Sequence, residues 1–407
     1  MSKNLIFSVS LLLLLTACNG EGNSGRRPTS ETQVKEQSAA KAVKPAVNVY
    51  IENSGSMDGY VKGITEFEQA VYNYVSDIII SHTADSVNLF YINSEVIKYN
   101  AALEDFIQKL EPTTFKQRGG NRGTSDIANV LGTVLKETGK NQISILVTDG
   151  IFSPGRGEDA EQYLVNQQIG IKRRFAEYLE KNKNAAVVVY QLSSNFNGTY
   201  YNKVDAKIQI NKQRPYYIWV IGDAAQVSIL RKQVPDSKFI GNGVQNVFTA
   251  IVGNHSVKNA LNPSIGVYDK PRDGSNTIKN LKKDSRTGKV KFAVNVNFSD
   301  LLLDDKYLLN PSNYENSSKY ALEIKPISTK NSKYTHILTF ASDKVYQGNV
   351  SVKLKAKLPD WIEKANDDDG ATAIDGKTYG IKYQIGGVFD AFTFDNNYYT
   401  EIKININ

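Results

Sequence analysis

The sequence predicts an α/β fold with a doubly wound, mostly parallel sheet, followed by a C-terminal all-β domain of the sandwich type. Short apolar runs alternate with segments of helical periodicity between residues 46 and 250, which is typical of α/β domains. Several of these runs are apolar without interruption, as expected for strands covered on both faces. From about residue 257 the helical periodicity fades, and short alternating stretches separated by Asn, Asp, Gly and Ser indicate a β-sandwich.

The α/β part is predicted from the order of its elements. Continuous apolar residues mark the central strands, and apolar residues three and four positions apart mark the helices. A polar, glycine-containing stretch at 197–214 reads as a hairpin or loop inserted near the sheet edge. The predicted strands are 46–51, 87–92, 96–99, 142–147, 185–192 and 216–221. The predicted helices are 60–81, 103–110, one that starts at Thr124 or Ser125 and runs to 135, 160–181 and 224–234.

The C-terminal part is predicted from period-two alternation of polar and apolar residues. One helical turn is expected at 360–364, inside the otherwise β-rich region. The predicted strands are 289–298, 320–327, 335–341, 349–358, 379–385 and 399–406.

Composition excludes several classes of function. The 407 residues suggest two or three domains, at roughly 100–200 residues each. The net charge of +7 comes from interspersed basic and acidic residues, so no nucleic-acid partner is expected. A single cysteine excludes disulfides within the chain and cysteine-based zinc sites. The three histidines lie far apart, so a histidine metal site or a Ser-His-Asp triad would need long-range convergence.

The first residues have the pattern of a signal peptide. Lys3 precedes an apolar run, Leu5 to Leu15, which is too short to span a bilayer. The run ends in Leu-Thr-Ala-Cys, which resembles the lipobox of bacterial lipoproteins and implies cleavage of residues 1–17 and lipidation of Cys18. The alternative is a chance cysteine after an ordinary signal peptide. A lipid anchor in the cell envelope is expected, and Asn19, which is not acidic, favours the outer membrane.

Residues 19–45 contain two valines and no leucine, isoleucine or aromatic residue. Such a stretch cannot bury enough apolar surface to offset its ordering entropy, so a flexible tether is expected. The predicted organisation is therefore a signal peptide (1–17), the lipidated cysteine and tether (18–45), the α/β domain (46–250) and the β-sandwich-like domain (251–407).

Three polar segments follow predicted strands or open a helix in the α/β part. Glu-Asn-Ser-Gly-Ser at 52–56 follows the first strand, a glycine-rich loop at 119–126 opens a helix, and Thr-Asp-Gly at 148–150 ends a central strand. Here the chain resembles the von Willebrand factor type A (VWA) family. The resemblance implies a metal-ion-dependent adhesion site, with a divalent cation that binds an acidic group of a protein partner. The implied ligands are Glu52, Ser54, Ser56, Thr124 and Asp149.

Oxygen donors with few formal charges suit Mg²⁺ or Mn²⁺, with Ca²⁺ as the alternative. Glu52 departs from the family pattern, which has Asp, and its longer arm moves the carboxylate by about 1 Å. Asp58 lies close enough in sequence to compensate. The alternative is a degenerate site in which the two serines only satisfy backbone groups of a tight turn. Arg118 and Arg122 either attract an anionic ligand or are solvated loop charges.

The sequence therefore predicts a membrane-anchored, non-enzymatic protein that binds a protein partner through the metal site. A cell-envelope scaffold with a degenerate metal site is the second hypothesis. A metal-assisted hydrolase using Asp149 or Asp126 as base is the third. The sequence leaves the partner's identity and the oligomeric state open.

Overall fold

The structure is a computed structural model that describes residues 43–407 apart from 124–125, 155–156, 270, 272 and 330. The predicted signal peptide, Cys18 and nearly all of the tether lie outside the described residues. Within the described ranges, no helix has both the length and the apolar character needed to cross a membrane. The fold is mixed α/β: one large sheet with helices, followed by smaller, mainly antiparallel sheets.

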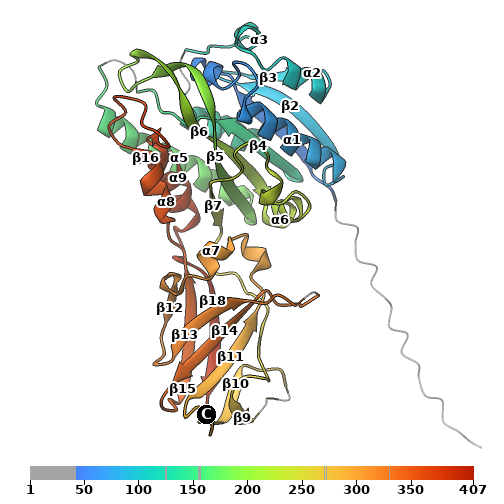
Figure 1. The fold of residues 1–407 in the computed structure, drawn as a ribbon, viewed down its shortest axis with the longest axis vertical. Helices are drawn as coiled ribbons and strands as arrows, with labels where there is room; N and C mark the ends of the chain where they lie inside the picture. The colour runs from blue at the N-terminus through green and yellow to red at the C-terminus, as the bar shows by residue number, and fades with distance from the viewer. Residues whose placement is uncertain (1–42, 124–125, 155–156, 270, 272, 330) are drawn as a thin grey trace, which may run out of the picture. The chain divides into compact units, whose positions relative to one another are not determined.

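The α/β part is built on a seven-stranded sheet of order β3-β2-β1-β4-β6-β5-β7 (Figure 1). β1 is parallel to β2 and β4, whereas the other four neighbouring pairs are antiparallel. The predicted mostly parallel sheet is therefore wrong. The reason is that β5 and β6, 17 residues each, form one hairpin, and β6 returns between β5 and β4. The strands are β1 (Ala46–Glu52), β2 (Ser86–Ile92), β3 (Val96–Tyr99), β4 (Gln142–Thr148), β5 (Ala185–Tyr201), β6 (Lys207–Asp223) and β7 (Asn246–Ile251).

Helices cover both faces of this sheet, as its uninterrupted apolar strands require. Alternate residues of β1 face opposite cores: Val49 packs with α1 and α6, and Tyr50 packs with α4 and α5. The predicted helices in this part are present, but the first begins at Glu66 and not at residue 60, and α3 was not predicted. The helices are α1 (Glu66–Ile80), α2 (Leu103–Gln108), α3 (Pro112–Gln117), α4 (Ile127–Glu137), α5 (Ala160–Lys181) and α6 (Ala224–Gln233), with the 3₁₀ helices η1 (Gly55–Gly59) and η2 (Asp236–Lys238).

The C-terminal part contains two sheets that share one apolar core. Their orders are β12-β15-β18-β10-β9 and β13-β14-β11-β8, and all pairs are antiparallel except β10 with β18. Phe292 of β11 stacks on Phe340 of β14 at 4.7 Å, in a core shared with Val352 of β15 and Ile404 of β18. The strands are β8 (Asn259–Leu261), β9 (Val267–Asp269), β10 (Thr277–Lys282), β11 (Val290–Val296), β12 (Tyr314–Asn316), β13 (Ala321–Pro326), β14 (His336–Ser342), β15 (Gly348–Lys355) and β18 (Tyr398–Ile406).

Short 3₁₀ and α segments connect β11 to β12. They are η3 (Ser299–Leu301), α7 (Asp305–Leu308) and η4 (Pro311–Asn313).

One segment of the C-terminal part packs on the α/β sheet. It contains α8 (Asp360–Ala365), the small pair β16 (Asn366–Asp367) and β17 (Thr378–Tyr379), and α9 (Ile381–Phe392). The prediction assigned all of 251–407 to a β domain, but buried residues of α9 share a core with α5 (Figure 1). The strand predicted at 379–385 is wrong, because its isoleucines belong to a helix. The helical turn predicted at 360–364 is confirmed as α8.

Candidate metal centre

The sheet brings two of the predicted ligand loops together. β1 and β4 are parallel neighbours with Ile51 opposite Val147, so their carboxyl ends lie at the same edge. Glu52 is the last residue of β1, and Asp149 directly follows β4. The two side chains are 2% and 1% exposed. Two carboxylates from distant parts of the sequence therefore share one buried location.

Ser54 and Ser56 complete the first loop. Ser54 precedes η1, and its Oγ lies 3.0 Å from Oγ of Ser56. Two oxygens bound side by side to one Mg²⁺ at about 2.1 Å are also separated by about 3 Å. This hydroxyl pair thus has the spacing that adjacent ligands of one octahedral ion require.

Asp149 has one carboxylate oxygen without a partner among the described residues. Its Oδ1 accepts a hydrogen bond from the backbone N–H of Ile151 at 3.1 Å, whereas its Oδ2 is buried and accepts none. Burial raises the pKa of Asp149 above its ordinary value, and the negative charge of Glu52 raises it further. A cation between these groups would offset both effects.

Glu52 is held from the side of β4. The hydroxyl of Thr148 donates to its Oε2, and the same Thr148 oxygen accepts the backbone N–H of Gly150 at 2.9 Å. One carboxylate oxygen of Glu52 is therefore committed to the sheet, and Oε1 has no such bond.

These residues fit a small divalent cation. Glu52, Ser54, Ser56 and Asp149 offer hard oxygen donors, and the unpaired Oδ2 of Asp149 is a buried acceptor that an ion would satisfy. Thr124, the fifth predicted ligand, lies outside the described residues. Over the described ranges, no group of three or more His, Cys, Asp or Glu side chains could hold a metal ion. The candidate centre depends instead on hydroxyl oxygens beside two carboxylates.

Arg122 holds the serine loop from the outside. Its Nε donates to the carbonyl of Asn53 at 2.6 Å, its Nη2 donates to the carbonyl of Ser54 at 3.2 Å, and it forms an ion pair with Asp58. The backbone N–H of Gly55 in turn donates to the carbonyl of Arg122 at 3.0 Å. Arg122 is thus a positioning residue for the loop, and Asp58 is occupied by an arginine.

The second predicted arginine has a separate role. The guanidinium of Arg118 lies 5.0 Å from the ring centre of Tyr91 and 4.8 Å from that of Tyr99. Two aromatic contacts of this kind are favourable cation–π interactions. Arg118 is therefore packed on the β2–β3 hairpin.

The candidate centre is buried beneath a cover made of two distant segments. We use this name for the outer part of the β5–β6 hairpin (194–214) and for residues 366–384. Tyr201 of the hairpin lies over the serine loop, since its hydroxyl is 3.2 Å from the position that a Cβ on Gly55 would take. In the second segment, Gln384 donates to the carbonyl of Gly150. Ser54, at 4% exposed, is as inaccessible as the two carboxylates.

Arg214 joins the two segments of the cover. Its side chain is 2% exposed, lies 5.0 Å from the ring centre of Tyr200, and donates from Nη1 to the carbonyl of Lys377 at 3.1 Å. Tyr217 of β6 adds a hydrogen bond to Thr378 at 3.1 Å. Sequence reasoning missed these residues because they are 50 or more positions away from the ligand loops and belong to no recognisable motif.

Asp126, the other base considered for hydrolysis, caps a helix. Its Oδ1 accepts the backbone N–H groups of Ala128 at 3.0 Å and Asn129 at 3.2 Å, at the start of α4. The carboxylate of Asp126 therefore satisfies backbone donors at the start of α4.

Comparison with known proteins adds no assignment. No protein-family model, no curated protein and no solved structure matches the chain.

Proposed function

We propose that this chain is a non-enzymatic, VWA-like binding protein that holds a divalent cation, Mg²⁺ or Mn²⁺, and uses it to bind an acidic group of a protein partner. The ligands are Glu52, Ser54, Ser56 and Asp149, with Thr124 as the fifth. The observation that carries the proposal is the buried, unpaired Oδ2 of Asp149 beside a serine pair with 3.0 Å between the hydroxyl oxygens. Parallel β2, β1 and β4 support a VWA-like core, although the antiparallel β6, β5 and β7 depart from a doubly wound sheet.

The anchoring of the protein is part of the same proposal. Lipidation of Cys18 and a flexible tether would hold the α/β part close to a bacterial membrane, with the outer membrane as the expected location. Several acyl chains, at about 0.8 kcal/mol per buried CH₂, anchor a protein firmly. The support for this part is the sequence at 1–45, which lies almost entirely outside the described residues.

A second function is favoured by the burial of the centre. Glu52, Ser54 and Asp149 are at most 4% exposed and Ser56 is partly exposed, so an acidic partner group must approach the ion past Ser56 or displace part of the cover. A cell-envelope scaffold that assembles through other surfaces, with a degenerate or purely structural cation site, requires no such movement.

The first experiment is a thermal melt of residues 19–407 in EDTA and then with Mg²⁺, Mn²⁺ or Ca²⁺. An ion at 100 times its dissociation constant stabilises the folded state by about 2.7 kcal/mol, which raises the melting temperature by several degrees. The shift should disappear in Asp149→Asn and in the double variant Ser54→Ala, Ser56→Ala. It should remain in Ser228→Ala, a matched control in which a buried serine of α6 is removed.

Partner capture then separates the two functions. Complexes cross-linked at the membrane that dissociate in EDTA and fail to form with Asp149→Asn support the metal-bridged function. No thermal shift with any ion, together with complexes that survive EDTA, would favour the scaffold.

A further inference from the structure

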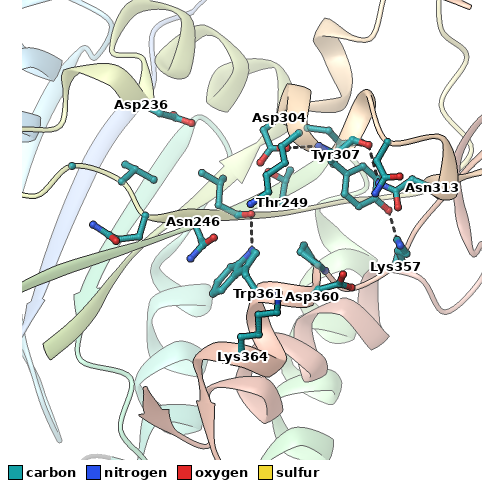
Figure 2. Close-up of a pocket in the computed structure, with 18 of the residues that line it drawn as sticks. Asp236, Asn246, Thr249, Asp304, Tyr307, Asn313, Lys357, Asp360, Trp361 and Lys364 are labelled. Atoms are coloured by element: carbon teal, nitrogen blue, oxygen red, sulfur yellow. Dashed lines mark hydrogen bonds between the residues drawn. The ribbon is translucent and has the colours of Figure 1, made fainter. Parts of the chain in front are cut away.

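A second candidate site lies away from the metal centre, in a cavity of about 570 Å³. Its walls come from β7, from the loop that follows η2, from the η3–η4 connection and from α8 with the residues before it (Figure 2). None of the predicted metal ligands lines it. Ligand sites commonly measure roughly 300–1,000 Å³ and combine apolar rings with a few directed polar groups.

Four aromatic rings line the cavity, and three of them are fixed by their polar atoms. Trp361 donates from Nε1 to the carbonyl of Val247 at 3.2 Å, Tyr307 donates from its hydroxyl to the carbonyl of Lys355 at 2.7 Å, and Tyr399 donates to the carbonyl of Thr249 at 3.3 Å. The rings of Trp361 and Tyr307 remain partly exposed. Rings held in this way offer flat apolar surface to a ligand at little entropic cost.

The cavity also collects positive charge. Lys306 comes from α7, Lys357 from the connection after β15, and Lys364 from α8, where it lies three residues after Trp361 (Figure 2). Within the described ranges, no carboxylate lies within 4.0 Å of any of these three ammonium groups. Their convergence from separate elements favours an anionic ligand.

The acidic residues of the wall do not cancel this charge. Asp236 forms an ion pair with Arg231 at 2.7 Å, and Asp304 caps α7 by accepting the backbone N–H of Tyr307 at 2.7 Å. Asp360 is then the one lining carboxylate without an ion-pair or hydrogen-bond partner in the described part of the chain. Three lysines face one uncommitted carboxylate.

A buried amide supplies a directed polar group. Asn313 is 2% exposed and donates from Nδ2 to the carbonyl of Tyr307 at 2.8 Å. Its Oδ1 is buried and, among the described residues, accepts no hydrogen bond. A hydroxyl or amine of a ligand in the cavity would supply the hydrogen bond that this buried acceptor lacks.

We propose that this cavity binds a small, ring-containing anion. The ring packs on Trp361 and Tyr307, its carboxylate or phosphate lies among Lys306, Lys357 and Lys364, and a hydroxyl or amine donates to Oδ1 of Asn313. A sugar acid and a mononucleotide share this chemistry. Both combine a ring, an anionic group and hydrogen-bond donors at a size that the cavity admits.

The test is titration calorimetry on residues 19–407 with two pairs of probes that differ in charge. Cellobiouronic acid is paired with cellobiose, and adenosine monophosphate with adenosine. At least one charged probe should bind about tenfold more tightly than its neutral twin, with an affinity that falls as salt rises. The pair that shows this preference identifies the source of the anion.

Variants then assign the binding to this cavity. Trp361→Ala should weaken the affinity for the preferred probe at least about tenfold. Lys357→Gln should reduce the ratio of the affinities for the charged and the neutral probe by about three- to tenfold. Phe394→Ala, which removes an aromatic ring that is 77% exposed, and Lys344→Gln are the matched controls and should change neither. Lys357→Gln keeps the test valid if Trp361→Ala fails to fold.

Three results would overturn the proposal. They are no binding of any probe up to about 10 mM, equal affinities within both pairs, and a preference that Lys357→Gln leaves unchanged.

Discussion

The docking of α9 on α5 makes a sharp prediction about two adjacent glycines. A Cβ on Gly387 would lie 2.6 Å from the backbone oxygen of Gln168 and 2.9 Å from Cβ of Ile171, both closer than real Cβ atoms approach. A Cβ on Gly386 would lie 3.2 Å from Nε2 of Gln168, the end of a flexible side chain. We therefore expect Gly387→Ala to destabilise the protein and Gly386→Ala to be tolerated.

The magnitude follows from two opposing terms. Replacing glycine by alanine inside a helix contributes up to about 1 kcal/mol of stability, and this gain is the same at both positions. Overpacking against fixed backbone costs about 1–3 kcal/mol, and it applies at Gly387 alone. Gly386→Ala should thus be neutral or stabilising by up to about 1 kcal/mol. The free energy of unfolding of Gly387→Ala should lie about 1–3 kcal/mol below that of Gly386→Ala.

Urea unfolding of residues 19–407 in EDTA, followed by circular dichroism, measures both variants. Because the propensity term cancels between them, the difference reports only the contact between α9 and α5. Equal unfolding free energies would refute the packing of 381–392 as a helix on α5. The same contact positions Gln384, which donates to the carbonyl of Gly150 beside the candidate metal centre.

Three further outcomes follow from the charged groups. Arg122→Ala leaves the Asp58 carboxylate without its ion pair and should lower the free energy of unfolding, measured in urea titrations, by about 1–3 kcal/mol. Adding Asp58→Asn to the same chain should recover part of that loss. Because the pKa of Asp149 is raised, the metal-free folded state binds more protons than the unfolded chain. This residue should therefore make the free energy of unfolding fall as the pH rises above 3.8. Asp149→Asn should remove that pH dependence in unfolding curves measured in EDTA. Burial lowers the pKa of His336 below its ordinary 6.5, so its contribution to stability should be present above pH 6.5 and lost as the pH falls. The melting temperature of His336→Gln should depend less on pH in that range. The same loss of stability at acid pH in the variant and the parent protein would contradict this assignment.

The convergence of Glu52 and Asp149 could be predicted from the sequence. Each follows a short apolar run, and parallel strands bring their carboxyl ends to one edge. The direction of β6 could not, because the part of β6 that pairs with β4 lies in the stretch 214–222, which is buried on both faces whichever way the strand runs. A fully buried strand carries no alternation that would distinguish a parallel from an antiparallel neighbour.

The error at α9 has a different cause. Tyr379, Ile381, Tyr383 and Ile385 alternate with polar or small residues and imitate a strand, and the Gly-Gly pair after them argues against a helix. Helical spacing becomes visible only when Val388 is included. This residue lies seven positions after Ile381, three after Ile385 and four before Phe392, all on the same helix face. The glycines are used for close approach to α5, which is a tertiary effect that local propensity does not contain.

The free energy needed to open the cover distinguishes the two candidate functions, because only metal-bridged binding depends on it. Its exposed ion pairs, Lys203–Asp369 and Lys212–Asp375, have carboxylates that are 68% and 81% exposed, so solvent screens them and each adds little to the stability of the closed state. The buried guanidinium of Arg214, bonded to backbone carbonyls of the second segment, holds the cover more strongly. A partner that reaches the ion by opening these contacts loses a factor of ten in apparent affinity for about every 1.4 kcal/mol of opening free energy. Loosening the cover should therefore strengthen metal-bridged binding, whereas assembly through any other surface should not respond.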